Sequence, residues 1–382
     1  MKTKFAAIAL ALPAASFAQS SSVTLYGLID SAVTYQTHAN SAGQSFTGLQ
    51  QGGEGFLSGS RFGLKGTEDL GGGTSAGFVL ENGFLADTGG MDQQGQIFGR
   101  QAFVSLRNDR LGEVSAGRLY TSANALLYWV DPLGVGAAPS NAWMVFLTGQ
   151  RYNNALQYAN TWGAWSVLAQ YALGETAGNS KASSSTALGV KYAAGPITAV
   201  GDFQQTRDYQ DRAARIYLAG VKAAIGSSTA LFANYIHSSR DANFDSSKGG
   251  TDTASITSMT TAATAANSAG YNSVFGTQRR DDFLTLGATY AINGNLGLSG
   301  AYMYDLTRAD GFRGHRATLY GVVDYAFSKR TDVYLAAAYD RVGGDWSGVL
   351  GNSTKNWTGG SGAALNGNNN QTTLMVGLRH KF

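Results

Sequence analysis

The sequence predicts an all-β protein, a sixteen-stranded antiparallel barrel that spans a membrane and is closed into a cylinder. Apolar and polar residues alternate with a period of two along many segments, as they do in strands with one oily and one wet face. The last segment, Thr372–Phe382, shows this pattern, and so does Val23–Asp30 near the other end. If these two strands pair, the sheet closes and leaves no open edge, which would otherwise invite aggregation.

The first eighteen residues are expected to be a secretory signal rather than part of the fold. Lys2 and Lys4 precede an apolar run, and Ser16-Phe17-Ala18 forms a small-x-small cleavage site. Residues 19–382 are then the mature barrel domain. Loss of the two lysines lowers the formal net charge from +3 to +1 (3 − 2 = 1).

The composition suits strands joined by glycine turns, with 51 glycines against four prolines and 19 tyrosines and 18 phenylalanines. There is no cysteine, so an exported chain has no disulfides and depends on its sheet for stability. No apolar run reaches the ~20 residues that a membrane helix needs. Membrane insertion is therefore predicted from the alternation alone.

Short turns and long connections alternate strictly after the signal. Seven turns are short: 69–73, 108–112, 161–164, 193–196, 225–228, 291–295 and 328–330. Eight polar segments are long: 36–59, 86–98, 122–153, 174–186, 207–215, 239–281, 307–317 and 342–371. They divide the chain into sixteen strands near the ~9–11 residues of a tilted membrane strand. A soluble sandwich would also alternate, but it would not need this one-sided division of turns and loops.

No pattern indicates catalysis, a cofactor or a metal. The four histidines are scattered without ligand spacing, and no Gly-x-Ser-x-Gly or His-Glu-x-x-His run occurs. The glycine run at 71–73 lacks the lysine and helix of a phosphate-binding loop. We predict neither enzyme activity nor nucleic-acid binding, although membrane-barrel enzymes remain an alternative that the fold alone does not exclude.

Strand parity places several basic side chains inside the barrel. Phe62 and Leu64 face outward, so Arg61 and Lys65 face inward. Arg100 faces inward on the strand that contains Phe103, and Arg151 begins a further strand. Three arginines at similar heights on neighbouring walls are costly like-charge crowding unless a pore uses them. Asp30, Asp202 and Asp324 are wall charges that could balance this field and leave the pore unselective.

Four segments carry a resemblance to a known family. The chain resembles the general-diffusion porins of Gram-negative outer membranes, and its last residues point to the beta-proteobacterial branch; the segments are 21–27, 60–73, 111–120 and 376–382. The resemblance implies a homotrimer whose third long loop folds inward toward an arginine cluster, with Arg61, Arg100 and Arg151 at the matching positions. It also implies that Phe382 is the signal read by the outer-membrane assembly machinery. Many relatives carry several carboxylates in the inward loop, whereas residues 119–150 contain only Asp131.

We therefore expect a passive, water-filled outer-membrane channel for small hydrophilic solutes, embedded in lipid and preferring anionic or neutral solutes. Two alternatives stay open. The barrel could act mainly as a surface adhesin or receptor, because its longest loop, 239–280, is polar, low in complexity and exposed. It could also be a substrate-specific channel, which saturable flux of one solute would reveal.

The signal-peptide interpretation makes a direct prediction. Protein taken from the outer-membrane fraction should begin at Gln19, because cleavage follows the small residue Ala18. Amino-terminal sequencing checks this, and an intact Met1 in that fraction would contradict it.

Overall fold

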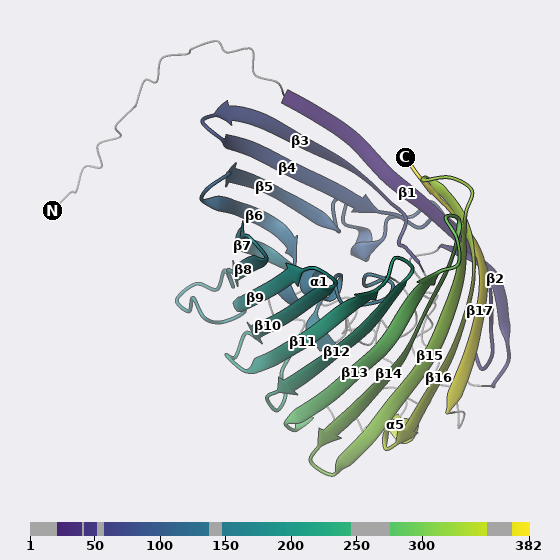
Figure 1. Cartoon of the computed structure of the whole chain (residues 1–382). Coiled ribbons are helices and arrows are strands. Elements are labelled where there is room, and N and C mark those ends of the chain that lie inside the picture. Colours follow the sequence, from purple (N-terminus) through teal and green to yellow (C-terminus); the bar gives the residue numbers. More distant parts are fainter. Residues whose placement is uncertain (1–20, 40–41, 52–56, 137–146, 246–275, 350–368) are drawn as a thin grey trace.

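The computed structural model describes residues 21–39, 42–51, 57–136, 147–245, 276–349 and 369–382. These residues form one antiparallel sheet that curves round and closes on itself, with a short helix inside the curved wall (Figure 1). The strands are β1 (Ser21–Gln36), β2 (Phe46–Gln51), β3 (Arg61–Gly71), β4 (Thr74–Gly83), β5 (Gln101–Asn108), β6 (Gly112–Tyr120), β7 (Arg151–Trp162), β8 (Trp165–Ala172), β9 (Ser185–Ala194), β10 (Ile197–Arg207), β11 (Ala213–Ile225), β12 (Thr229–Arg240), β13 (Arg279–Ala291), β14 (Leu296–Ala309), β15 (Phe312–Ala326), β16 (Thr331–Gly344) and β17 (Asn370–Lys381). The helices are η1 (Gln93–Gly95), α1 (Ser122–Leu127) and α5 (Trp346–Val349).

The barrel closes where the first and last strands meet, as the alternation at the two ends of the chain predicts. Leu28 to Gln36 of β1 pair with Lys381 back to Thr373 of β17. The last residue completes the seam, because Phe382 and Gly27 exchange backbone hydrogen bonds of 3.0 and 3.1 Å. Lipid offers no partner for a free backbone group, so this seam lets every strand sit between two neighbours.

Seventeen strands make sixteen positions in the wall, because β2 and β3 share one. Ser31–Gln36 of β1 pairs with β2, whereas Ser21–Leu28 pairs with β3. The predicted long loop 36–59 is therefore wrong in part, since it contains β2. Between the two pieces, the Ser60 hydroxyl accepts a hydrogen bond from the Asp30 backbone N–H (3.0 Å) and donates one to its carbonyl (3.2 Å).

The connections confirm a short side and a long side. All seven predicted short turns join consecutive strands, and glycines with positive φ, such as Gly163 (+57°) and Gly226 (+62°), make several of them. On the other side, the predicted long segment 307–317 is wrong. The strands β14 and β15 pair up to Ala309 and Phe312 and turn over Asp310 and Gly311 alone. Gly311 has φ +64°, a conformation that an Asp-Gly hairpin turn favours.

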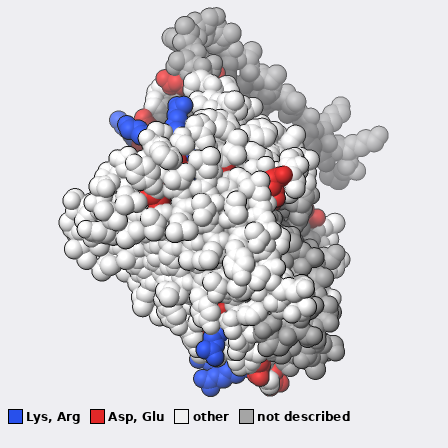
Figure 2. Space-filling view, turned by 90° about the vertical axis from the view of Figure 1, so that its right-hand side faces the viewer, with Lys and Arg blue, Asp and Glu red and all other residues white. Residues whose placement is uncertain are grey.

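The wall is apolar outside and polar inside. On β17, Leu374, Val376 and Leu378 are exposed, whereas the alternate residues Thr373 and Met375 are buried on the inner face. Figure 2 shows one outer face, where blue Lys and Arg side chains gather near the upper and lower edges and the wide area between is almost entirely white. Tyrosines, tryptophans and phenylalanines lie at both ends of the apolar band, as in the aromatic girdles of membrane barrels; they include Trp162, Trp165, Tyr290, Phe327, Tyr217, Tyr235 and Tyr339.

Charged side chains on the inner face pair with one another. Arg316 forks onto Asp340 through Nε (3.0 Å) and Nη2 (2.5 Å). Nearby, Asp281 accepts from Arg279 and from the Thr307 hydroxyl, which in turn accepts from the Trp346 indole of α5 (3.0 Å). Among the described helices, none is long and apolar enough to cross a membrane.

The outward face makes a prediction about insertion. Val376 is 61% exposed, and its cross-strand neighbours Val33 and Leu335 are also apolar and exposed. Val376→Arg should destabilise the folded barrel by about 2–4 kcal/mol, the cost of an arginine on the lipid face near the membrane centre. His380→Arg, on the same face at the end of the strand, is the matched control and should cost at most about 1 kcal/mol. Reversible unfolding in lipid vesicles measures both, and equal costs would contradict this placement.

Candidate pore constriction

The described parts of the third long connection, residues 121–136 and 147–150, fold into the barrel, and we call them the inward loop. Hydrogen bonds join the two ends of this loop. The Thr121 N–H donates to the Gln150 carbonyl (3.1 Å), and the Thr121 hydroxyl donates to the Gly149 carbonyl (3.0 Å). Thr121 also caps α1, accepting from the Asn124 N–H (3.2 Å). The helix then packs on the inner faces of β8, β9 and β10.

Glycines on the inner wall make room for this loop. A Cβ on Gly189 of β9 would lie 2.5 Å from Leu126, one on Gly220 of β11 2.6 Å from Val130, and one on Gly287 of β13 2.4 Å from Pro132. The loop thus follows the wall from β9 to β13. A larger residue at any of these positions would force the loop side chain opposite it to shift.

Polar contacts tie the loop to the same wall. The Ser122 hydroxyl donates to Asp202 on β10 (2.5 Å), and the Asn234 amide on β12 donates to the Val130 carbonyl (3.2 Å). Gln204 on β10 donates to the Thr148 carbonyl on the returning arm. Because a buried polar group left unpaired costs free energy, these contacts hold the loop in one place.

Four arginines occupy the wall formed by β3 to β7, and we call them the arginine cluster: Arg61, Arg100, Arg118 and Arg151. Arg61 begins β3, Arg118 lies on β6 and Arg151 begins β7, while Arg100 immediately precedes β5. Arg61 is half-buried and is the most accessible, since Arg100, Arg118 and Arg151 are 8%, 9% and 1% exposed. Arg61 lies within electrostatic range of Arg100 and Arg151.

One carboxylate and two tyrosines hold the cluster together. Glu81 on β4 accepts from Arg100 Nε (2.7 Å) and from the Tyr26 hydroxyl (3.0 Å). Arg100 Nη2 donates to the Tyr120 hydroxyl (2.9 Å), and the Arg151 guanidinium stacks 5.0 Å above the Tyr120 ring. A charged pair at such short distance is locked in orientation, so these guanidinium groups form a fixed positive surface.

Carboxylates also lie on this wall. Asp92 is a second one, in electrostatic range of Arg100. The four guanidinium groups contribute a positive field to this side of the barrel. Low-dielectric walls focus such a field into the water between them.

The other two residues expected at the constriction are Lys65, which lies beside Tyr26, and Asp131, which lies in the inward loop. Lys65 is four residues further along β3, with its Nζ 5.3 Å from the Tyr26 ring centroid. Asp131 lies near Tyr320 of β15, beyond the loop, and its Oδ2 accepts from the N–H groups of Leu133 and Val135 (3.1 and 2.9 Å). Asp131 therefore holds a turn of the loop.

Sequence reasoning missed three members of the wall: Glu81, Arg118 and Tyr120. Glu81 has no signal of its own, because one acidic residue in the strand Thr74–Gly83 does not reveal a partner nineteen residues away. Arg118 lies beside a bulge between Gly117 and Leu119, where the register with β7 shifts and simple alternation fails. Tyr120 sits at the strand end, where an aromatic residue reads equally well as part of a girdle.

A cavity of about 370 Å³ lies between the end of α1 and the inner faces of β5 to β9. Its lining combines an indole with charged groups of both signs, including Trp129, Lys191, Arg107 and Glu113. Lys191 Nζ lies 3.7 Å above the Trp129 ring, close enough for a cation–π contact. No group of three metal-ligating side chains occurs among the described residues.

The fold and the site together define a class. A closed barrel with an apolar outer band, a charged interior and a loop folded along its inner wall is a β-barrel of the outer-membrane type. Comparison with known proteins then gives the family. Residues 5–345 match the family model described as Gram-negative porin, and the chain belongs to that family. Its place is therefore the outer membrane.

Three relatives illustrate the similarity. An outer membrane porin protein of Bordetella pertussis is 36% identical over 168 residues, which cover 41% of this chain and 44% of the relative, so the match spans under half of that protein. The anion-selective porin from Comamonas acidovorans has a similar structure, with a TM-score of 0.70 and 25% identity over 95% of this chain and 100% of that one. OmpT of Vibrio cholerae, in its trimer form, shares the fold at a TM-score of 0.64 and 15% identity, over 95% and 100% of the two chains.

The wall glycines predict how the loop is held. Gly220→Leu should push Val130 and the inward loop away from β11 and narrow the opening, so single-channel conductance should fall. The control is Gly297→Leu on β14, also on the inner face, where a Cβ meets nothing within 4 Å. Conductance in planar bilayers checks both variants. If Gly220→Leu conducts like the native protein, the contact does not set the loop position.

Proposed function

We propose that this chain forms a passive, water-filled channel for small hydrophilic solutes and ions, and that the channel prefers anions. The observation that carries this proposal is the arginine cluster, four basic side chains gathered on the inner wall from β3 to β7. Membership of the porin family supports a channel rather than an enzyme, and we propose no reaction and no cofactor.

The pattern of accessibility supports an anion path past Arg61 in particular. Its Nε donates to the Gly59 carbonyl (2.9 Å), and its side chain is only half-buried. Arg100, Arg118 and Arg151 are nearly covered and act through their field rather than by contact. A similar solved structure is that of an anion-selective porin, whose whole length this chain covers.

We also propose that the protein works as a homotrimer inserted by the outer-membrane assembly machinery, with Phe382 as the assembly signal. A trimer form of a protein with the same fold supports the first part. The role of Phe382 in the closing seam is consistent with a need for an intact carboxyl terminus.

Detergent samples should migrate as a trimer before boiling and as a monomer after it. Identical mobility would contradict the trimer.

Reversal potentials in a potassium chloride gradient test the selectivity. The native channel should show an anion preference that weakens at high salt, because mobile ions screen the field with a Debye length of ~10 Å at 0.1 M. Arg61→Glu changes the charge of this wall by −2, so the potential should move toward cation preference.

The matched control is Lys329→Glu, which makes the same charge change in the exposed turn between β15 and β16. It should leave the potential close to the native value, because the site lies outside the barrel wall. A cation-preferring native channel, or equal shifts in the two variants, would show that the arginine cluster does not set selectivity.

A further inference from the structure

Three arginines stand side by side on the outer face of the barrel, at the end that carries the long loops. Arg280 of β13 lies directly opposite Arg308 of β14, and Arg308 lies directly opposite Arg313 of β15. All three are exposed, while their strand neighbours Asp281 and Thr307 are buried on the inner face. We call these three residues the arginine row.

The three like charges of the arginine row repel one another. Directly opposed side chains have their Cβ atoms about 5 Å apart, and like charges at that distance destabilise a sheet. Asp282 pairs with Arg308 (2.6 Å), but it also accepts hydrogen bonds from Tyr235 and His237. In the described part of the chain, no carboxylate contacts the guanidinium of Arg280 or Arg313. Three positive charges against one negative leave an excess of two (3 − 1 = 2).

Neighbouring acids do not pair with these two guanidinium groups. Asp345 is close to Arg313, but its carboxylate accepts from the backbone N–H of Arg313 (2.6 Å) rather than from the guanidinium. Asp310, at the turn beyond Arg308, forms no ion pair with the row among the described residues. The guanidinium groups of Arg280 and Arg313 therefore face outward at the edge of the apolar band without an ion pair in the described part of the chain.

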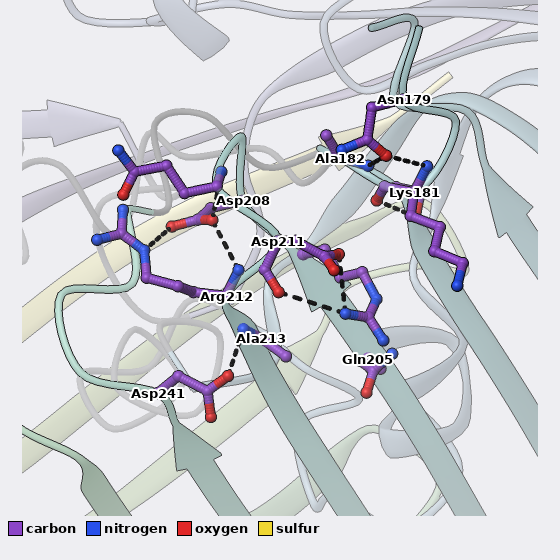
Figure 3. Close-up of polar contacts among 12 residues, drawn as sticks. Asn179, Lys181, Ala182, Gln205, Asp208, Asp211, Arg212, Ala213 and Asp241 are labelled. Carbon is purple, nitrogen blue, oxygen red and sulfur yellow. Dashed lines mark hydrogen bonds and ion pairs between the residues drawn. The ribbon is translucent and has the colours of Figure 1, made fainter.

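The adjoining rim shows that such arginines can be neutralised by the chain itself. At the turn between β10 and β11, Asp208 lies against Arg212 (2.7 Å), as Figure 3 shows. Asp211 pairs with Arg207 (2.9 Å) at the same turn. Arg215 on β11 pairs with Asp241 (3.1 Å). The arginine row differs from this rim in having two guanidinium groups without such a partner.

The surface next to the row becomes apolar toward the middle of the wall. His237 and His315 lie level with the residues two positions from the arginine row toward the middle of the wall. Further in the same direction lie Tyr235, Leu284 and Tyr304, which are exposed or half-buried. The Tyr304 and His315 rings stack at 5.9 Å. A ligand that satisfies this surface has an anionic end and an apolar body, in that order along the barrel wall.

We propose that the arginine row binds the phosphate groups of an anionic membrane lipid, whose apolar chains lie along Tyr235, Leu284 and Tyr304. Arginine is suited to this because its planar fork donates two parallel hydrogen bonds to phosphate oxygens. Basic side chains at a membrane surface attract anionic headgroups, and the attraction falls off within a Debye length. Binding relieves the repulsion within the row, so the lipid stabilises this wall.

The test uses the purified full-length barrel in detergent with two probes, bisphosphorylated lipid A and the same glycolipid with its phosphates removed. The triple variant Arg280→Gln, Arg308→Gln, Arg313→Gln should bind the bisphosphorylated form at least tenfold more weakly than native protein does. Its affinity for the dephosphorylated form should stay within twofold. Raising the salt should weaken native binding of the bisphosphorylated form only.

The matched control is Arg110→Gln, Lys329→Gln, Arg330→Gln, which removes three exposed charges from turns at the opposite end. It should bind both probes as native protein does. Unchanged affinity in the row variant, or equal losses in the control or for the dephosphorylated lipid, would overturn the proposal.

Stability separates lipid binding from a structural role. Without lipid, the row variant should unfold at the native temperature or above it, because the change removes repulsion. If the arginines merely held the sheet together, the variant would unfold earlier, with or without lipid. Should the triple variant fail to fold, Arg313→Gln alone tests the proposal, since its guanidinium makes no contact among the described residues, and a threefold or greater loss of phosphate-dependent affinity is expected.

Discussion

The backbone hydrogen bonds that join β1 to β17 are the contact on which the rest of this structure depends. Within lipid, a backbone N–H or C=O that lacks a partner costs several kcal/mol, and water is not there to replace it. A sheet with two free edges would leave two whole strands in that state. Closure removes both edges at once, so the barrel forms as a whole. The carboxyl-terminal Phe382, bonded to Gly27, sits at the last rung of this closure.

Closure reverses the distribution of polar and apolar residues that a soluble protein has. The apolar residues of alternate positions face lipid, and the interior has to accommodate charge, as the Arg316–Asp340 and Arg379–Asp332 pairs do on the inner wall. The interior also holds an apolar cluster, in which Leu126, Leu127 and Val130 of the inward loop join buried wall residues such as Ile216 and Ile236. Glycines at three wall positions leave space for the loop. The arginine cluster lies on the wall from β3 to β7, where Arg61 alone of its four members is half exposed.

Much of this arrangement follows from the sequence, and the reason is the period of two. Alternation in Thr331–Arg341 and Thr372–Phe382 fixes which residues face lipid, and glycine turns fix where strands end. The inward orientation of Arg61 follows from Phe62 and Leu64 in the same way. The predictions that fail concern features that the alternation of residues does not encode. The bulge beside Arg118 breaks the parity, Asp131 is used by its own loop, and polar strand ends around 307–317 resemble a loop because they rise beyond the apolar band.

The divided strand β2–β3 has an effect on how this barrel responds to mutation. In a β-ladder the rungs are backbone to backbone, so exchanging a side chain leaves them intact. Beside Asp30, however, the hydroxyl of Ser60 takes the place of a backbone partner and serves both the N–H and the carbonyl group. At this one position, the hydrogen bonding between neighbouring strands therefore depends on the identity of a side chain. A single substitution at Ser60 can remove or restore these two hydrogen bonds, which is possible at hardly any other kind of position in a sheet.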